Sequence, residues 1–174
     1  TTADTVTSIG DSSFYRCTNL TSVKIPNSLV EIGSFAFFYC SSLTMSIVIP
    51  NGVTSIGQNT FYGCNITSVT IPDSVTSIGM WAFCACSSLT SVIIGNSVTE
   101  IGEEAFAQCP NLIQLILFSS TPPTLGSSAI PTTISKIYVQ KSSKEAYDAA
   151  TNWTAFANKI VSDDLYLSFA RFNI

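Results

Sequence analysis

Six cysteines are the side chains of this sequence best suited to covalent or metal chemistry, and five of them recur at a regular spacing. The regular ones are Cys17, Cys40, Cys64, Cys86 and Cys109, and only Cys84 falls outside the series. A thiolate nucleophile needs a neighbouring base and a zinc site needs further ligands, but the chain contains no histidine. We therefore predict a column of small, buried free thiols, with a disulfide framework as the alternative.

Carboxylates are the second group that could carry out catalysis. Glu100, Glu103 and Glu104 lie close together, but Asp73 is the only acid between Glu31 and Glu100. Paired carboxylates for general acid–base catalysis are therefore scarce, and the sequence has neither a glycine-rich phosphate loop nor a serine nucleophile elbow. We predict a protein that is not an enzyme, with no catalytic residue, no metal site and no cofactor. A calcium site at the three glutamates is the alternative.

The composition disfavours further classes of function. Only 10% of the 174 residues are charged, and 7 Lys and Arg against 11 Asp and Glu give a sequence pI near 4.5. This balance disfavours a nucleic-acid surface, which needs basic side chains. No apolar run approaches the ~20 residues of a membrane span, and a hydrophobic content of 46% is too high for a disordered chain. Because the sequence has no initiator Met, we expect a mature or excised segment.

A repeat of about 23 residues explains the cysteine spacing. An Ile-Gly pair recurs at steps of 23, 24, 22 and 23 residues, at Ile9-Gly10, Ile32-Gly33, Ile56-Gly57, Ile78-Gly79 and Ile101-Gly102. A Phe follows each Ile five positions later, and a Leu follows eleven positions later in four of the five units. Apolar side chains at fixed positions of so short a unit are buried only when the units stack on one another.

Each unit contains two extended segments and one turn. Segments such as Leu89-x-x-Val92-x-Ile94 predict a short strand with one buried face, and a Pro ends this strand in three units because it lacks a backbone donor. Val75-x-x-Ile78 predicts a second, shorter extended piece, and Ala82-Phe83-x-x-Cys86 has the spacing of one helical or 3-10 turn. The sequence thus predicts an α/β repeat solenoid with a wall of parallel strands and short turns.

The repeat also carries a resemblance to a known family. The run Ile71-Pro72-Asp73-Ser74-Val75-Thr76-Ser77-Ile78-Gly79, followed by Ala82-Phe83 and Cys86 to Val92, resembles the BspA-like leucine-rich repeat. This class shares the 23-residue step found here and occurs in surface proteins of bacteria and some protozoa. The resemblance covers about residues 4–118 and implies a right-handed leucine-rich-repeat solenoid with a helical C-terminal cap.

Three parts follow one another along the chain. Residues 1–118 hold five leucine-rich repeats, and residues 119–162 hold a C-terminal cap made of a strand and helices. The segments Ile137-Tyr138-Val139, Ala146-Tyr147 and Trp153 to Ile160 resemble the cap of such proteins, although Gln140 stands where that cap often has Pro. Ser142-x-x-Glu145 predicts a capping box at the first helix. Residues 163–174 are an apolar tail without an assigned role, and an edge strand and a partner contact are both open.

The outward residues of the predicted wall are the candidate ligand-binding residues, because they point to the concave, solvent side. One column comprises Ser22, Ser46, Ser68, Ser91 and Gln114, and the other comprises Lys24, Val48, Thr70, Ile93 and Ile116. An exposed apolar strip is typical of a protein contact, whereas mutual support of neighbouring strands is the structural alternative. Aromatic residues outside the core register, Phe38, Tyr39, Tyr62 and Trp81, are expected on the turn side.

The resemblance implies a non-catalytic protein-binding or adhesion module of a secreted or cell-surface protein, located outside the cell or at its surface. The expected partner is a protein of the host matrix or of another cell surface, and no nucleic acid and no membrane span are expected. Two alternatives remain: a structural spacer within a longer surface protein, and a glycan-binding or hydrolytic module that uses Glu103 and Glu104. The sequence does not indicate the oligomeric state.

Overall fold

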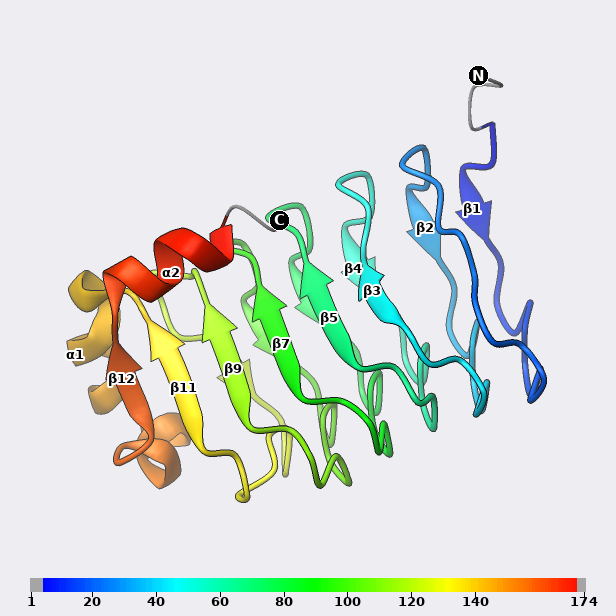
Figure 1. Cartoon of the computed structure of the whole chain (residues 1–174). Coiled ribbons are helices and arrows are strands. Elements are labelled where there is room, and N and C mark those ends of the chain that lie inside the picture. The colour runs from blue at the N-terminus through cyan, green and yellow to red at the C-terminus, as the bar shows by residue number, and fades with distance from the viewer. Residues whose placement is uncertain (1–4, 172–174) are drawn as a thin grey trace.

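The alternating β-branched segments of the repeats stack into one parallel sheet, here called the wall. The computed structural model describes residues 5–171, and in it the wall has the strand order β12-β11-β9-β7-β5-β3. The strands are β3 (Ser46–Val48), β5 (Ser68–Ile71), β7 (Ser91–Ile94), β9 (Gln114–Leu117), β11 (Lys136–Val139) and β12 (Ile160–Ser162) (Figure 1). Buried residues alternate with more exposed ones in β5 and β7, because successive side chains point to opposite faces.

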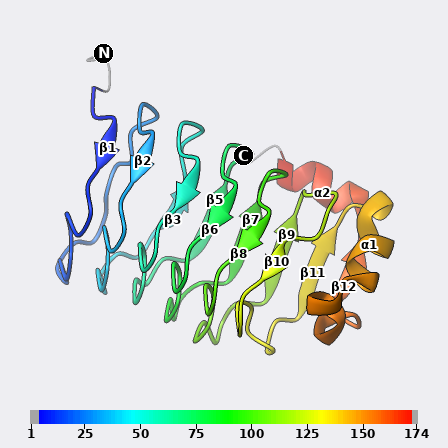
Figure 2. The same cartoon turned by 180° about the vertical axis from the view of Figure 1, so that it is seen from behind.

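The Ile-Gly pairs build a second set of short parallel strands behind the wall, seen from the other side in Figure 2. They are β1 (Ser8–Ile9), β2 (Glu31–Ile32), β4 (Ser55–Ile56), β6 (Ser77–Ile78), β8 (Glu100–Ile101) and β10 (Thr124–Leu125). The glycine allows a close approach between coils. A Cβ on Gly102 would lie 2.7 Å from the backbone nitrogen of Met80, closer than such atoms can come.

The segment after each Ile-Gly pair is a series of tight turns, and the prediction of a helical or 3-10 turn was wrong in this detail. Two residues per turn have a positive φ, for example Phe35 at 58° and Tyr39 at 57°. Their N–H groups donate to the next coil, from Phe35 to the Gln58 carbonyl at 3.0 Å and from Tyr39 to the Tyr62 carbonyl at 2.7 Å. Because every buried backbone donor needs a partner, these alternating conformations link the coils in a way that a helical turn cannot.

A column of phenylalanines fills the space between the two sets of strands. The rings of Phe14, Phe37, Phe61, Phe83 and Phe106 stack at centroid distances of 5.0, 5.2, 5.4 and 5.3 Å and lie within 5° of parallel. The thiols of Cys40, Cys64, Cys86 and Cys109 donate to the carbonyl of the Phe in the preceding coil, at 3.1 to 3.2 Å. The predicted ladders therefore form, and they are the core of the solenoid.

The repeat geometry continues beyond residue 118, where we expected the cap to begin. β10 places Leu125 beside Ile101, and Ile130 is buried at the position that Phe occupies in the other units. Leu125-Gly126 replaces the Ile-Gly pair and Ile130 replaces the Phe. These substitutions hide the unit from a pattern built on Ile-Gly and Phe, although they keep the buried apolar side chains that the fold needs.

Helices close the end of the stack, as the resemblance implied. The elements are a 3-10 turn η1 (Lys141–Ser143), α1 (Lys144–Ala149) and a second 3-10 helix η2 (Thr151–Phe156). Trp153 is buried beneath them and donates from Nε1 to the Pro123 carbonyl at 2.8 Å, and its ring meets Tyr147 edge-on at 5.0 Å. The predicted capping box does not form, because the chain enters α1 through η1 and Ser143 is the N-cap without a side-chain bond.

Residues 164–171 of the apolar tail fold into a helix and not into an edge strand, and residues 172–174 lie outside the described residues. Helix α2 (Asp164–Arg171) follows β12 and lies in front of the wall in Figure 1, across the ends of β12, β11 and β9. Its buried residues are Leu167 and Ala170. Within residues 5–171 no helix combines the length and the apolar character that crossing a membrane requires.

Candidate functional site

The two predicted columns lie side by side on the outer surface of the wall, here called the wall face, which comprises the outward side chains of β3, β5, β7, β9 and β11. The first column runs in register through Ser46, Ser68, Ser91 and Gln114, and the second through Val48, Thr70, Ile93 and Ile116. β11 extends them with Lys136 beside Gln114 and Tyr138 beside Ile116. The sequence interpretation missed these two because it assigned β11 to the cap.

The first unit does not join this ladder. Residues 17–30 contain no strand, and Ser22 and Lys24 are exposed on this segment. The second unit is one residue longer than the first. A hollow of about 250 Å³ remains between the two segments, and Lys24, Ser46 and Val48 are among the residues that line it.

The open part of the wall face is the part over β3 and β5. The Val48 side chain is 57% exposed there, and the Ser68 hydroxyl donates to Ser46 Oγ at 2.8 Å. Thr70 follows Val48 in the second column and is half-buried. The surface therefore combines one exposed apolar side chain, and not the expected strip of three, with neutral hydroxyls, and the hollow lies at its edge.

The other end of the wall face is covered by α2. Ile116 is only 3% exposed and packs with Phe118, Leu167 and Ala170, and Ile93 is half-buried against the same cluster. The prediction that Ile116 is an exposed residue was therefore wrong. The reason is a contact between residues about fifty positions apart, which no feature of the repeat unit encodes.

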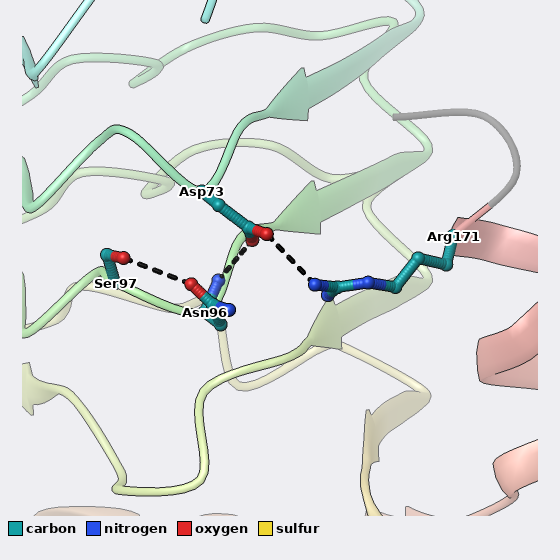
Figure 3. Close-up of polar contacts among 4 residues, drawn as sticks. All are labelled: Asp73, Asn96, Ser97 and Arg171. Atoms are coloured by element: carbon teal, nitrogen blue, oxygen red, sulfur yellow. Dashed lines mark hydrogen bonds and ion pairs between the residues drawn. The ribbon is translucent and has the colours of Figure 1, made fainter.

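Polar contacts hold α2 in this place. Figure 3 shows Arg171 reaching from the end of α2 to Asp73, with a distance of 2.9 Å between Nη2 and Oδ2. The other oxygen of Asp73 accepts the N–H of Asn96 at 2.8 Å, so the carboxylate joins two coils and the helix. The Arg171 guanidinium also lies 4.6 Å from the centre of the Phe118 ring, and the Tyr166 hydroxyl donates to Gln114 Oε1 at 3.0 Å.

Cys40, Cys64, Cys86 and Cys109 form a column of thiols inside the solenoid. All six are free thiols, and five of them are buried. Burial raises the pKa of Cys86, and it raises the pKa of Cys84 to about 11. The adjacent Cys40 thiol together with burial raises the pKa of Cys64. Because the thiolate is the nucleophilic form, Cys64, Cys84 and Cys86 stay in the unreactive thiol form at neutral pH. Hydrogen bonds with the thiols of Cys64 and Cys86 lower the pKa of Cys40 and of Cys109, respectively.

The glutamates do not gather into a site for a metal ion. Glu100 lies in β8, and Glu103 and Glu104 lie in the turn that follows, where Glu104 has a φ of 50°. Within residues 5–171 no group of three or more Cys, Asp or Glu side chains is arranged to hold a metal. The alternative of a calcium site at these residues gains no support from the geometry.

Comparisons with known proteins agree with this architecture. The profile of the BspA type leucine rich repeat region matches residues 7–133 in six copies. This range includes the unit built around Leu125 and Ile130. The chain therefore belongs to the BspA-type leucine-rich repeat family, a class of repeat scaffold for protein interaction. A comparison with curated proteins finds no match.

Two solved bacterial structures share the fold. A leucine rich cell surface protein from Faecalibacterium prausnitzii is 25% identical, with a TM-score of 0.54 over 96% of this chain and 54% of its own length. A leucine-rich repeat protein from T. pallidum is 26% identical, with a TM-score of 0.60 over 90% of this chain and 62% of its own length. The chain thus spans 54% and 62% of these two proteins.

Proposed function

We propose that this chain is a non-catalytic protein-binding module of a secreted or cell-surface protein, and that it acts in adhesion. The open part of the wall face over β3 and β5 is its contact surface. The observation that carries the proposal is the position of Val48, which is 57% exposed beside a hollow and a row of hydroxyls. The partly buried side chains of Val23, Ile25 and Met45 line the same hollow and join Val48 in one apolar patch. Contiguous apolar patches rimmed by polar groups mark sites of protein contact.

Three further features support this proposal. The family is a scaffold for protein interaction, and one similar structure is described as a cell surface protein. Five of the six thiols are buried, and within residues 5–171 no three acidic or thiol side chains are grouped so that they could hold a metal, so neither group favours catalysis. The partner that fits the surface is a protein with a small apolar projection, since a charged partner would find few opposite charges in a sequence with 10% charged residues.

The experiment compares two matched substitutions. Val48→Asp places a charge at the centre of the proposed contact surface, and Val30→Asp places the same charge just before β2, at a valine that is 55% exposed. Binding is measured on a panel of immobilised, purified matrix proteins, with serum albumin as the negative control. We expect Val48→Asp to abolish binding to the matrix protein that the native chain binds, and Val30→Asp to leave it unchanged.

Two outcomes would contradict the proposal. Equal binding by both variants and the native chain would place the contact outside the wall face. If the native chain binds no matrix protein and no cell surface, the structural spacer is favoured. In that role the module only separates other parts of a longer protein.

A further inference from the structure

A groove lined by aromatic side chains runs along the turn edge of the solenoid, which is the lower edge in Figure 1 and is separate from the wall face. Its volume is about 450 Å³, and its aromatic lining comprises Phe35, Phe38, Tyr39, Tyr62 and Trp81. These residues and the polar ones beside them come from four consecutive coils. With about 4.8 Å between coils, the aromatic groove is roughly 14 Å long, the length of a short oligomeric ligand.

The rings in the aromatic groove form a continuous apolar surface. Phe38 stacks on Tyr62 at 5.0 Å between centroids, and Tyr39 lies 5.3 Å from Phe38 and 5.7 Å from Tyr62. Phe35 adds a further tilted ring at 5.7 Å from Phe38. Three of the aromatic side chains, those of Phe35, Tyr39 and Trp81, stand at positive φ. Large side chains are rare in this conformation, so the template of the turn does not by itself explain the aromatic surface.

Polar side chains without partners also line the aromatic groove. They are Gln58, Asn59, Glu104 and Gln108, and within residues 5–171 no hydrogen bond reaches any of these side chains. Asn59 is the decisive one, because it is only 3% exposed and yet its amide lines the groove. Its amide atoms still reach the surface of the groove, since the Ser143 hydroxyl is the only fully buried side-chain polar atom without a partner in residues 5–171. The Asn59 amide is therefore free to form hydrogen bonds with a ligand in the groove.

We infer that the aromatic groove binds a neutral saccharide. The flat faces of a sugar ring present C–H groups, which pack against the negative faces of aromatic rings. Its hydroxyls both donate and accept, so they can satisfy the amides of Asn59 and Gln108 and donate to the carboxylate of Glu104 at the same time. This combination of aromatic planes and unpaired amides is a binding site separate from the protein-binding surface.

Two other ligands of aromatic grooves fit this lining less well. A quaternary ammonium ion is attracted to aromatic faces, but its charged group cannot form hydrogen bonds, so it makes no use of the amides of Gln58, Asn59 and Gln108. A proline-rich peptide also binds aromatic grooves, but proline carbonyls only accept hydrogen bonds. It would therefore present acceptors to Glu104, which as a carboxylate is itself an acceptor.

Fluorescence of the native chain provides the test, because its two tryptophans differ in position. Trp81 lines the aromatic groove, whereas Trp153 is fully buried in the cap, so a ligand in the groove changes the emission of Trp81 alone. The chain is titrated with oligosaccharides of glucose, mannose, galactose and N-acetylglucosamine, and separately with choline and with a proline-rich peptide. We expect a saturable change with at least one neutral oligosaccharide and none with choline or the peptide.

Variants then locate the binding. Trp81→Ala removes the stacking surface, and binding followed by calorimetry should weaken about tenfold or more. Gln108→Ala removes an exposed amide and keeps the test valid if Trp81→Ala does not fold. Val48→Asp on the wall face is the control and should bind the saccharide like the native chain. Unchanged saccharide binding in both groove variants, no saturable response to any oligosaccharide, or a response to choline or the peptide instead would each overturn the inference.

Discussion

Val48 and Ile116 occupy the same position of the repeat and lie in the same column of the wall face, but their surroundings differ completely. Val48 is 57% exposed and Ile116 is 3% exposed. Both stand on strands of one sheet. The neighbouring column places the hydroxyl of Ser46 beside Val48 and the amide of Gln114 beside Ile116. The difference comes from α2, which packs Leu167 and Ala170 over Ile116 and leaves Val48 open.

The contrast shows that the repeat fixes the direction of a side chain but not its exposure. Direction follows from the pleat of the strand, which is the same in every coil. Exposure depends on what else the chain brings to that surface, and here one helix of eight residues covers the β9 and β11 end. The open and covered parts of one face thus provide a pair of environments in which the same substitution should change stability by very different amounts.

The largest effect is expected in the column of phenylalanine rings, which lies beneath both the open and the covered part of the wall face. Phe61 is fully buried and stacks between Phe37 at 5.2 Å and Phe83 at 5.4 Å. Phe61→Ala should lower the free energy of unfolding by ~3–5 kcal/mol, because the neighbouring rings are held by their own coils and cannot close the cavity. Urea denaturation followed by circular dichroism measures the change. A loss below about 1 kcal/mol would show that the ring column does not support the stack.

The next effect separates the two parts of the wall face. Ile116→Asp buries a carboxylate under α2 without a partner and should lower the free energy of unfolding by about 2–4 kcal/mol. Val48→Asp introduces the same group in the same column at an exposed position and should change it by less than about 0.5 kcal/mol. Both values come from matched denaturation curves. Equal changes in the two variants would mean that α2 does not cover Ile116 in solution.

Much of this architecture could be predicted from the sequence, and the errors have a physical cause. The Ile-Gly, Phe and Cys positions predicted the stack, because each residue type fills one place in every coil. The register of Ser68 with Ser91 and of Thr70 with Ile93 followed from the same counting, and the structure confirms it. These features depend only on contacts between neighbouring coils.

Features that depend on other contacts could not be predicted in this way. Ile116 is buried by Leu167, and the repeat unit carries no sign of that helix. No strand forms around Val23, although this segment carries the same apolar pattern as the strands of the other units. The aromatic groove was partly foreseen from Tyr62 and Trp81, but Asn59 was missed. Asn is common at positive φ, so the sequence gives no reason to single out Asn59. Only the structure shows that its side-chain amide lines the groove without a hydrogen bond to the protein.

A third substitution tests α2 directly. Leu167→Asp removes the apolar contact with Ile116 and Phe118 and should lower the free energy of unfolding by about 1.5–3 kcal/mol, the usual contribution of one buried leucine. Leu165→Asp is the matched control on the same helix, since Leu165 is 70% exposed, and it should have little effect. Amide hydrogen exchange should show faster exchange in α2 for the first variant only. Unchanged protection of α2 in Leu167→Asp would contradict the packing.

The smallest effect concerns the ion pair between Arg171 at the end of α2 and Asp73, which follows β5. Asp73 and Arg171 are both partly exposed, so their coupling in a double-mutant cycle of Asp73→Asn and Arg171→Ala should be only about 0.2–1 kcal/mol. The coupling should fall further at high salt, because exposed charges are screened. Arg171→Ala alone should be more harmful than Asp73→Asn alone, since it also removes the contact of the guanidinium with the Phe118 ring. A coupling well above this range would mean that the pair, and not the apolar cluster, holds the helix on the wall and keeps one half of its face covered.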